Sequence, residues 1–135
     1  MVMKKSYSRE FEASPQFSWT NASVISAGAT TILSWESYKP TSKKYLPFNF
    51  TRVINNSAVE IIVYPNQDTN NPIYVPNGTI LSIDRDTIPA VNSFAIKNNG
   101  GANVTANQIV ISNSRQGVTQ DGIVARLHKR LLGGI

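Results

Sequence analysis

Residues 58–64 read AVEIIVY, and this stretch decides the fold class. Val59, Ile61 and Val63 fall on one face of an extended chain, and the residues between them fall on the other. A period of two, carried by β-branched and aromatic residues, is typical of a strand with one face against a core. We therefore expect a half-buried β-strand here, preceded by a turn at residues 55–57.

The same pattern continues in both directions along the chain. Asn, Gly and Pro clusters separate short stretches that are rich in β-branched and aromatic residues. Further strands are predicted within residues 17–26, 29–38, 46–54, 73–76, 79–84, 91–98 and 103–112. Such regular short strands predict an all-β fold, a single β-sandwich of about seven or eight strands, with helix content near zero between residues 17 and 114.

Three connections have recognisable turn chemistry. Ala27-Gly28 suits a tight connection between the first two strands, and Pro76-Asn77-Gly78 suits a turn before residue 79. The run Asn98-Asn99-Gly100-Gly101 is tolerant of positive φ, so the two strands that flank it are expected to form a hairpin. Residues 40–44 are expected to be a loop.

The two ends of the chain differ from the middle. Residues 1–16 lack a sustained period and end near Ser14-Pro15, which predicts an extended N-terminal arm. Within residues 115–135 the apolar period changes to a helical one, and basic residues lie opposite the apolar stripe. We expect an amphipathic helix there, followed by a tail, with the sandwich domain spanning residues 17–114. The stripe could pack on its own sandwich, on a neighbouring subunit or on a membrane surface.

Charge is distributed unevenly over the 135 residues, whose net charge is +5. Residues 1–57 carry seven Lys or Arg against three Glu, giving +4, and residues 58–114 carry two against four acids, giving −2. Residues 115–135 carry four against one, giving +3. Charged residues are 16% of the chain, compared with roughly 25% in an average soluble domain. The ends and the Lys39–Lys44 loop are therefore the expected electrostatic contacts.

The residue inventory argues against catalysis. Cysteine is absent, so thiolate nucleophiles, disulfides and cysteine-based metal sites are excluded. His128 is the single histidine, and it lies among cations that disfavour its protonated form. Asp84 and Asp86 could hold a hard cation through oxygen ligands, although an ordinary polar strand end is the favoured explanation. We expect no enzyme activity, no cofactor and no small-molecule substrate.

Four further sequence patterns bear on function, two because they are missing and two because they match only weakly. Glycine patterns that cradle phosphates are missing, and no stretch approaches the length of a membrane span or a secretory signal. Asn-x-Ser/Thr triplets begin at residues 21, 49, 55, 77 and 103, and a chain rich in these residues produces such triplets by chance. Basic residues next to aromatic ones, as in Lys39 to Tyr45, could track phosphates and stack bases.

The stretch from Phe50 to Ser112 resembles the β-sandwich modules of phage and archaeal-virus particles. It contains FTRVINNSAVEIIVYPN, IYVPNGTILSID and VNSFAIKNNGGANVTANQIVIS, and covers about half the chain. The resemblance implies a jelly-roll-like fold and a virion structural role, as a minor capsid, penton, cement, turret or spike-base component. It also implies that terminal arms clip neighbouring subunits together, and that the protein is made in the host cytoplasm and resides in the virion.

The sequence therefore predicts a structural assembly protein. Its expected partners are copies of itself and other structural subunits, while the basic ends leave nucleic acid or a membrane surface open as partners. A receptor- or glycan-binding module and a single-stranded nucleic-acid-binding protein are the alternatives. The residues expected to make assembly contacts are basic or apolar and lie in the two ends: Lys4, Lys5, Arg9, Phe11, Ile123, Arg126, Leu127, Arg130 and Leu131.

Overall fold

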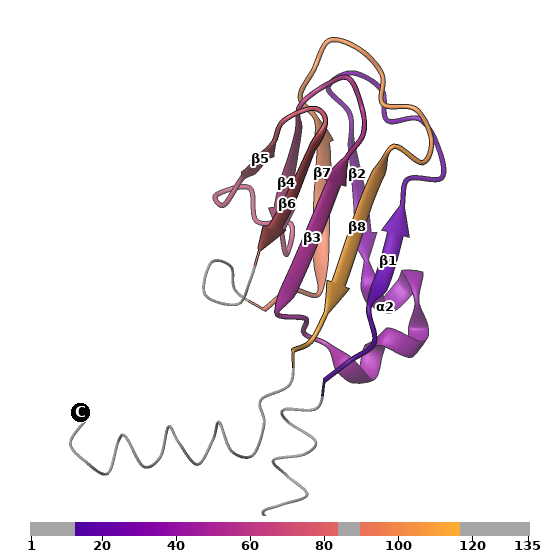
Figure 1. Ribbon diagram of the computed structural model, residues 1–135, viewed down its shortest axis with the longest axis vertical. Helices are drawn as coiled ribbons and strands as arrows, with labels where there is room; N and C mark the ends of the chain where they lie inside the picture. The colour runs from indigo at the N-terminus through magenta and orange to yellow at the C-terminus, as the bar shows by residue number, and fades with distance from the viewer. Residues whose placement is uncertain (1–12, 84–89, 117–135) are drawn as a thin grey trace, which may run out of the picture.

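The computed structural model describes residues 13–83 and 90–116, which form two facing four-stranded β-sheets (Figure 1). All strand pairs are antiparallel. The described strands are β1 (Phe17–Thr20), β2 (Thr30–Ser34), β3 (Phe50–Asn55), β4 (Ile61–Pro65), β5 (Ile73–Val75), β6 (Thr79–Ile83), β7 (Ser93–Asn98) and β8 (Ile109–Ser114). The predicted all-β sandwich is confirmed.

The order of the strands identifies the topology. One sheet has the order β1-β8-β3-β6 and the other has the order β2-β7-β4-β5. The chain changes sheet at each step from one strand to the next, except between β4 and β5. Two four-stranded sheets connected in this way form a jelly roll. Two edges of the sandwich result: β1 and β2 lie at one edge, and β5 and β6 lie at the other.

Residues that point inward from both sheets form one core. Val53 and Ile111 lie opposite each other in the first sheet, and both are fully buried. Leu33, Phe94 and Val63 provide the facing layer from the second sheet. Each such side chain contributes about 1.5–3 kcal/mol when it is fully buried. Ile61 and Val63, which the period of two in residues 58–64 placed on one face, both belong to this core.

The predicted hairpin between residues 91–98 and 103–112 is wrong. β7 pairs with β2 and β4, whereas β8 lies in the other sheet between β1 and β3. The connection crosses from one sheet to the other, with Val104 paired to Ile25 on the way. The turn residues are present, but the chain that follows them enters the opposite sheet, because Val104 and Ile109 are buried in the core on that side.

The expectation of near-zero helix content is also wrong. The strand predicted over residues 29–38 ends at Ser34, and α2 (Trp35–Tyr38) follows it directly. The predicted loop at residues 40–44 lies within a 3₁₀ helix, η1 (Pro40–Tyr45), which begins on a proline. The Trp35 ring is fully buried and packs edge-on against Phe48 at 5.7 Å, so the chain must turn there instead of continuing as a strand.

Several predicted strands are shorter than expected. Those predicted over residues 46–54 and 103–112 correspond to Phe50–Asn55 and Ile109–Ser114. The strand predicted over residues 17–26 ends at Thr20, and Ile25 forms only an isolated bridge. The strand in residues 58–64 begins at Ile61, and Ile62 on its outer face is only 5% exposed. This strand is therefore buried on both faces at Ile62, where the long side chains of Tyr74 and Lys97 lie beside it on the same face of the sheet.

Candidate assembly surfaces

Both ends of the described chain lie side by side. The backbone N–H of Ser14 donates to the carbonyl of Arg115 at 2.9 Å, and the backbone N–H of Arg115 donates to the Ser14 hydroxyl at 2.7 Å. Asn49 adds two hydrogen bonds to this junction. Its side-chain Nδ2 donates to the carbonyl of Gln116, and its Oδ1 accepts from the backbone N–H of Gln116. The described part of the chain therefore begins and ends at the same end of the sandwich, next to α2 (Figure 1).

This end of the sandwich is basic. We call the residues Lys39, Lys43, Lys44, Tyr45 and Arg115 the base. The described residues contain six Lys or Arg in total, and four of them belong to the base. Glu36 forms an ion pair with Lys43 at 3.2 Å, which is solvent-exposed and contributes little to stability. The base therefore presents a net positive surface beside the two chain ends.

Aromatic rings hold several of these cations in place. Lys44 lies over the Tyr45 ring at 4.8 Å, and the Arg115 guanidinium lies 5.8 Å from the same ring. Lys39 lies 5.8 Å from the centre of the Tyr38 ring, which is 44% exposed. The sequence predicted the Lys39–Lys44 part of this cluster. Arg115 was missed as a member, because about seventy residues separate it from Tyr45.

The opposite end of the sandwich is nearly uncharged. Four loops form this end, which we call the loop end, and they span residues 21–29, 56–60, 76–78 and 99–108 (Figure 1). Glu60 is their single charged residue, and it accepts a hydrogen bond from the Asn99 side chain at 2.9 Å. The two ends of the molecule therefore differ in charge, with cations gathered at the base.

Buried asparagines organise the loop end. Asn21 and Asn55 are 3% and 0% exposed, so two of the predicted glycosylation triplets are internal structural elements. Asn55 donates to the carbonyls of Val59 and Val75, and Asn21 donates to that of Thr105. In contrast, the asparagines of the triplets at residues 77 and 103 are exposed.

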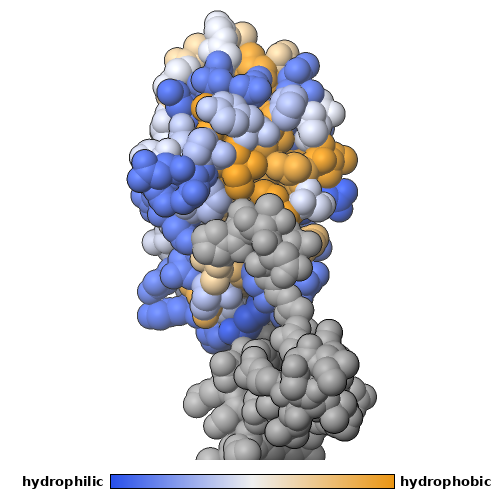
Figure 2. All heavy atoms as spheres, turned by 90° about the vertical axis from the view of Figure 1, so that its left-hand side faces the viewer, coloured by the Kyte–Doolittle hydropathy of each residue, from blue (hydrophilic) through white to orange (hydrophobic). Residues whose placement is uncertain are grey.

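The β5–β6 edge carries an apolar surface. Figure 2 looks onto this side of the molecule and shows hydrophobic residues gathered across its middle. Ile80 of β6 is 56% exposed, and Tyr74 of β5 is 55% exposed. Ile54 and Ile80 lie directly opposite each other on the outer face of the first sheet.

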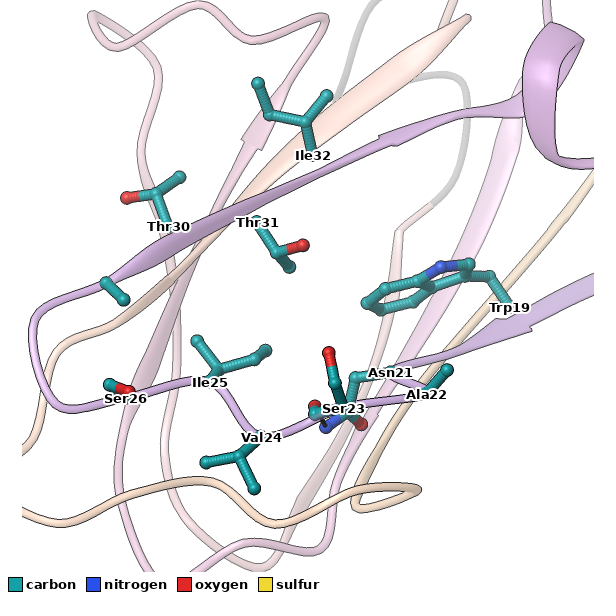
Figure 3. A pocket seen from close by; sticks show the side chains of 11 residues that line it. Trp19, Asn21, Ala22, Ser23, Val24, Ile25, Ser26, Thr30, Thr31 and Ile32 are labelled. Atoms are coloured by element: carbon teal, nitrogen blue, oxygen red, sulfur yellow. Dashed lines mark hydrogen bonds between the residues drawn. The ribbon is translucent and has the colours of Figure 1, made fainter.

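The β1–β2 edge is open and forms a cleft (Figure 3). Its volume is about 360 Å³, and it lies between β2 and the 21–29 loop. Trp19, Ile25 and Thr31 point into it, while Ile32 points away from it on the outer face of β2. No charged residue lines the cleft, so it suits uncharged groups.

Other predicted sites fall partly outside the described residues. Lys4, Lys5, Arg9 and Phe11 lie there, as do all the contact residues predicted in the C-terminal helix, the possible cation ligands Asp84 and Asp86, and His128. Among residues 13–83 and 90–116, no group of three or more His, Cys, Asp or Glu comes together. Within the same ranges, no helix is long and apolar enough to cross a membrane.

Comparisons with known proteins give structural similarity without sequence similarity. No protein-family model matches the chain, and no curated protein sequence matches it. A solved chain of Desmodium yellow mottle tymovirus is 9% identical with a TM-score of 0.43, covering 78% of this chain and 87% of that one. The Tobacco streak virus coat protein, solved as a dimer, is 9% identical with a TM-score of 0.36, covering 77% and 86%.

These comparisons leave the resemblance to phage or archaeal-virus modules a prediction. At TM-scores of 0.43 and 0.36 and 9% identity these likenesses carry no argument, so function is inferred from this chain's own surfaces.

Proposed function

We propose that this protein is a structural subunit of a virion, and that it assembles with copies of itself and with other structural subunits. Its role is to bind neighbouring subunits, and it carries out no catalysis. The sandwich is the rigid part, and the two chain ends and the base make the contacts to neighbours. The residues of the ends that we assign to this role are Lys4, Lys5, Arg9, Phe11, Ile123, Arg126, Leu127, Arg130 and Leu131.

The hydrogen-bonded pair of Ser14 and Arg115 carries this proposal. It holds Ser14 and Arg115, beyond which the two terminal segments continue, at one place on the sandwich. The segments themselves are basic, and they depart from a basic surface. A subunit built in this way can place both contact segments on the same side of an assembly. The jelly-roll topology is one that capsid proteins use, which agrees with this role.

Truncation tests the proposal. The full chain should form a multisubunit species, measured by multi-angle light scattering, because its terminal segments bury apolar and charged groups on neighbours. A chain of residues 13–116 keeps the Ser14–Arg115 pair and every described strand, so it should stay folded by circular dichroism and lose the multisubunit species, leaving nothing larger than a dimer. Chains that lack only one of the two terminal segments should form species of intermediate mass. An assembly of unchanged mass without both segments would contradict the proposal.

Binding of single-stranded nucleic acid is a second candidate function. It is favoured by the lysine and arginine side chains of the base that lie over tyrosine rings. Lysine and arginine can neutralise phosphates, and exposed tyrosine rings can stack on bases. Replacing both Lys39 and Lys44 by Glu should weaken binding of an unstructured oligonucleotide by about tenfold or more at low salt. Replacing both Arg52 and Lys97 by Glu is the control, because these are the two cations of the described residues that do not belong to the base. Equal losses in the two variants would reject a specific role for the base.

A further inference from the structure

The edge strand β2 has unpaired backbone groups whose positions can be deduced. In antiparallel pairs, residues alternate between those whose N–H and C=O point at the partner and those whose groups point away. The N–H of Asn98 donates to Ala29 at 2.9 Å, and the N–H of Trp35 donates to Asn92 at 3.2 Å. These bonds direct the odd-numbered residues of β2 toward β7. The N–H and C=O groups of the strand's even-numbered residues, Thr30, Ile32 and Ser34, therefore point out of the sheet.

This set of groups is complementary to itself. If a second copy of β2 lies antiparallel with a two-fold axis at Ile32, Ile32 faces Ile32 of that copy. Thr30 then faces Ser34 of the second copy, and Ser34 faces its Thr30. Every outward-pointing residue of β2 is thus matched with another outward-pointing residue. An isologous contact of this kind closes on itself as a dimer.

The side chains of this edge suit the same contact. Ile32 is 59% exposed on the outer face of β2, and Val24 in the adjacent loop is 52% exposed. From residue 13 to residue 35 the chain contains no charged side chain, so nothing there repels an identical strand. An antiparallel arrangement also places the two positively charged bases at opposite ends of the pair, each beside the uncharged loop end of the other copy.

Other described edge strands carry features that usually discourage pairing. β5 has three residues and lies between Pro72 and Pro76. β6 shares the tetrapeptide TILS with β2, at residues 79–82 and 31–34, but the sequence after it continues with the charged residues 84–86. β1 has four residues and follows Pro15 closely. β2 has five residues and none of these features.

We propose that β2 pairs with β2 of a second copy, antiparallel and centred on Ile32, so that two β2-β7-β4-β5 sheets become one eight-stranded sheet. The proposal rests on the assembly function and names one of its contacts. The pairing covers Ile32 and closes the exposed backbone edge.

Cysteine cross-linking tests this pairing directly, because the native chain contains no cysteine. Directly opposite residues in a hydrogen-bonded antiparallel pair have Cα atoms about 5.5 Å apart, which a disulfide can span. Full-length Ile32→Cys should therefore oxidise to a disulfide dimer on non-reducing gels. Ile80→Cys is the matched control, because Ile80 is similarly exposed on the opposite edge, and it should remain largely uncross-linked.

Two further variants test the register. Thr30→Cys and Ser34→Cys should each cross-link poorly alone, whereas their mixture should give a heterodimer. The pairing is rejected if Ile32→Cys forms no more dimer than Ile80→Cys, or if Thr30→Cys alone cross-links as well as the mixture. Ile32→Lys should weaken dimerisation at least tenfold, and Ile80→Lys should leave it unchanged.

Light scattering of the same reduced samples separates this inference from the proposed function. Large assemblies without an Ile32→Cys cross-link would reject the β2 pairing and leave the assembly function standing. A cross-linked dimer that never grows further would support the pairing and contradict the virion role. A monomer that does not cross-link would reject both.

Discussion

At the scale of single residues, three buried asparagines hold the loop end together. Each side chain donates to loop carbonyls and accepts a backbone N–H, so it takes the place of a missing strand partner. Asn98, for example, donates to Ile25 and Ala102 and accepts from Gly100. Charged groups are hardly needed to order these loops, which allows the loop end to stay neutral.

Asn55→Ala should strongly destabilise the fold. The change removes the buried donor to the Val75 carbonyl, one of two donors to the Val59 carbonyl and the buried acceptor of the Ser57 N–H, and costs about 3 kcal/mol of the free energy of unfolding. Chemical denaturation measures the loss. Asn56→Ala is the control, because its side chain is exposed and the change should cost less than about 0.5 kcal/mol. Similar losses in both variants would show that the buried amide is not the anchor.

At the scale of elements, the sequence predicted where the strands lie better than how they pair. Alternation at residues 58–64 and 91–98 marked β4 and β7, because one face of each strand must meet the core. Turn residues such as Asn98 to Gly101 occur both in hairpins and in connections that cross between sheets. Their presence therefore could not show which kind of connection follows β7. α2 was missed because the residues up to Trp35 keep a strand-like composition, and only packing against Phe48 stops the strand.

Packing between loops gives a prediction at this scale, where the β7–β8 loop crosses the β3–β4 loop. A Cβ atom added to Gly100 would lie 2.5 Å from Val59, whereas one added to Gly101 would meet nothing within 4 Å. Gly100→Ala should therefore lower the free energy of unfolding by about 1–3 kcal/mol, and Gly101→Ala should be close to neutral. Thermal unfolding of the two variants measures the difference.

A second substitution at Val59 checks the cause. Adding Val59→Gly to Gly100→Ala should recover part of the loss, because it removes both the Cβ and the Cγ1 atoms that lie 2.5 Å from the new Cβ. If the double variant is destabilised by the full sum of the two single losses, the clash is not the reason.

At the scale of the whole molecule, the positively charged base and the nearly uncharged loop end lie at opposite ends of the sandwich. Sequence charge alone located the basic segments, and it predicted that the ends and the Lys39–Lys44 loop act as contacts. It could not show that Ser14 and Arg115 lie together, since about a hundred residues separate them. The proposed contacts of the ends remain predictions, because their residues lie outside the described parts of the chain.

The most direct measurement of the central claim is electron microscopy of the purified full-length protein at near-physiological salt. We expect uniform multisubunit particles or a defined oligomer in which the sandwich repeats with symmetry. A monomer over the whole accessible concentration range, with no particles in any field, would contradict the account of this chain as a structural assembly subunit.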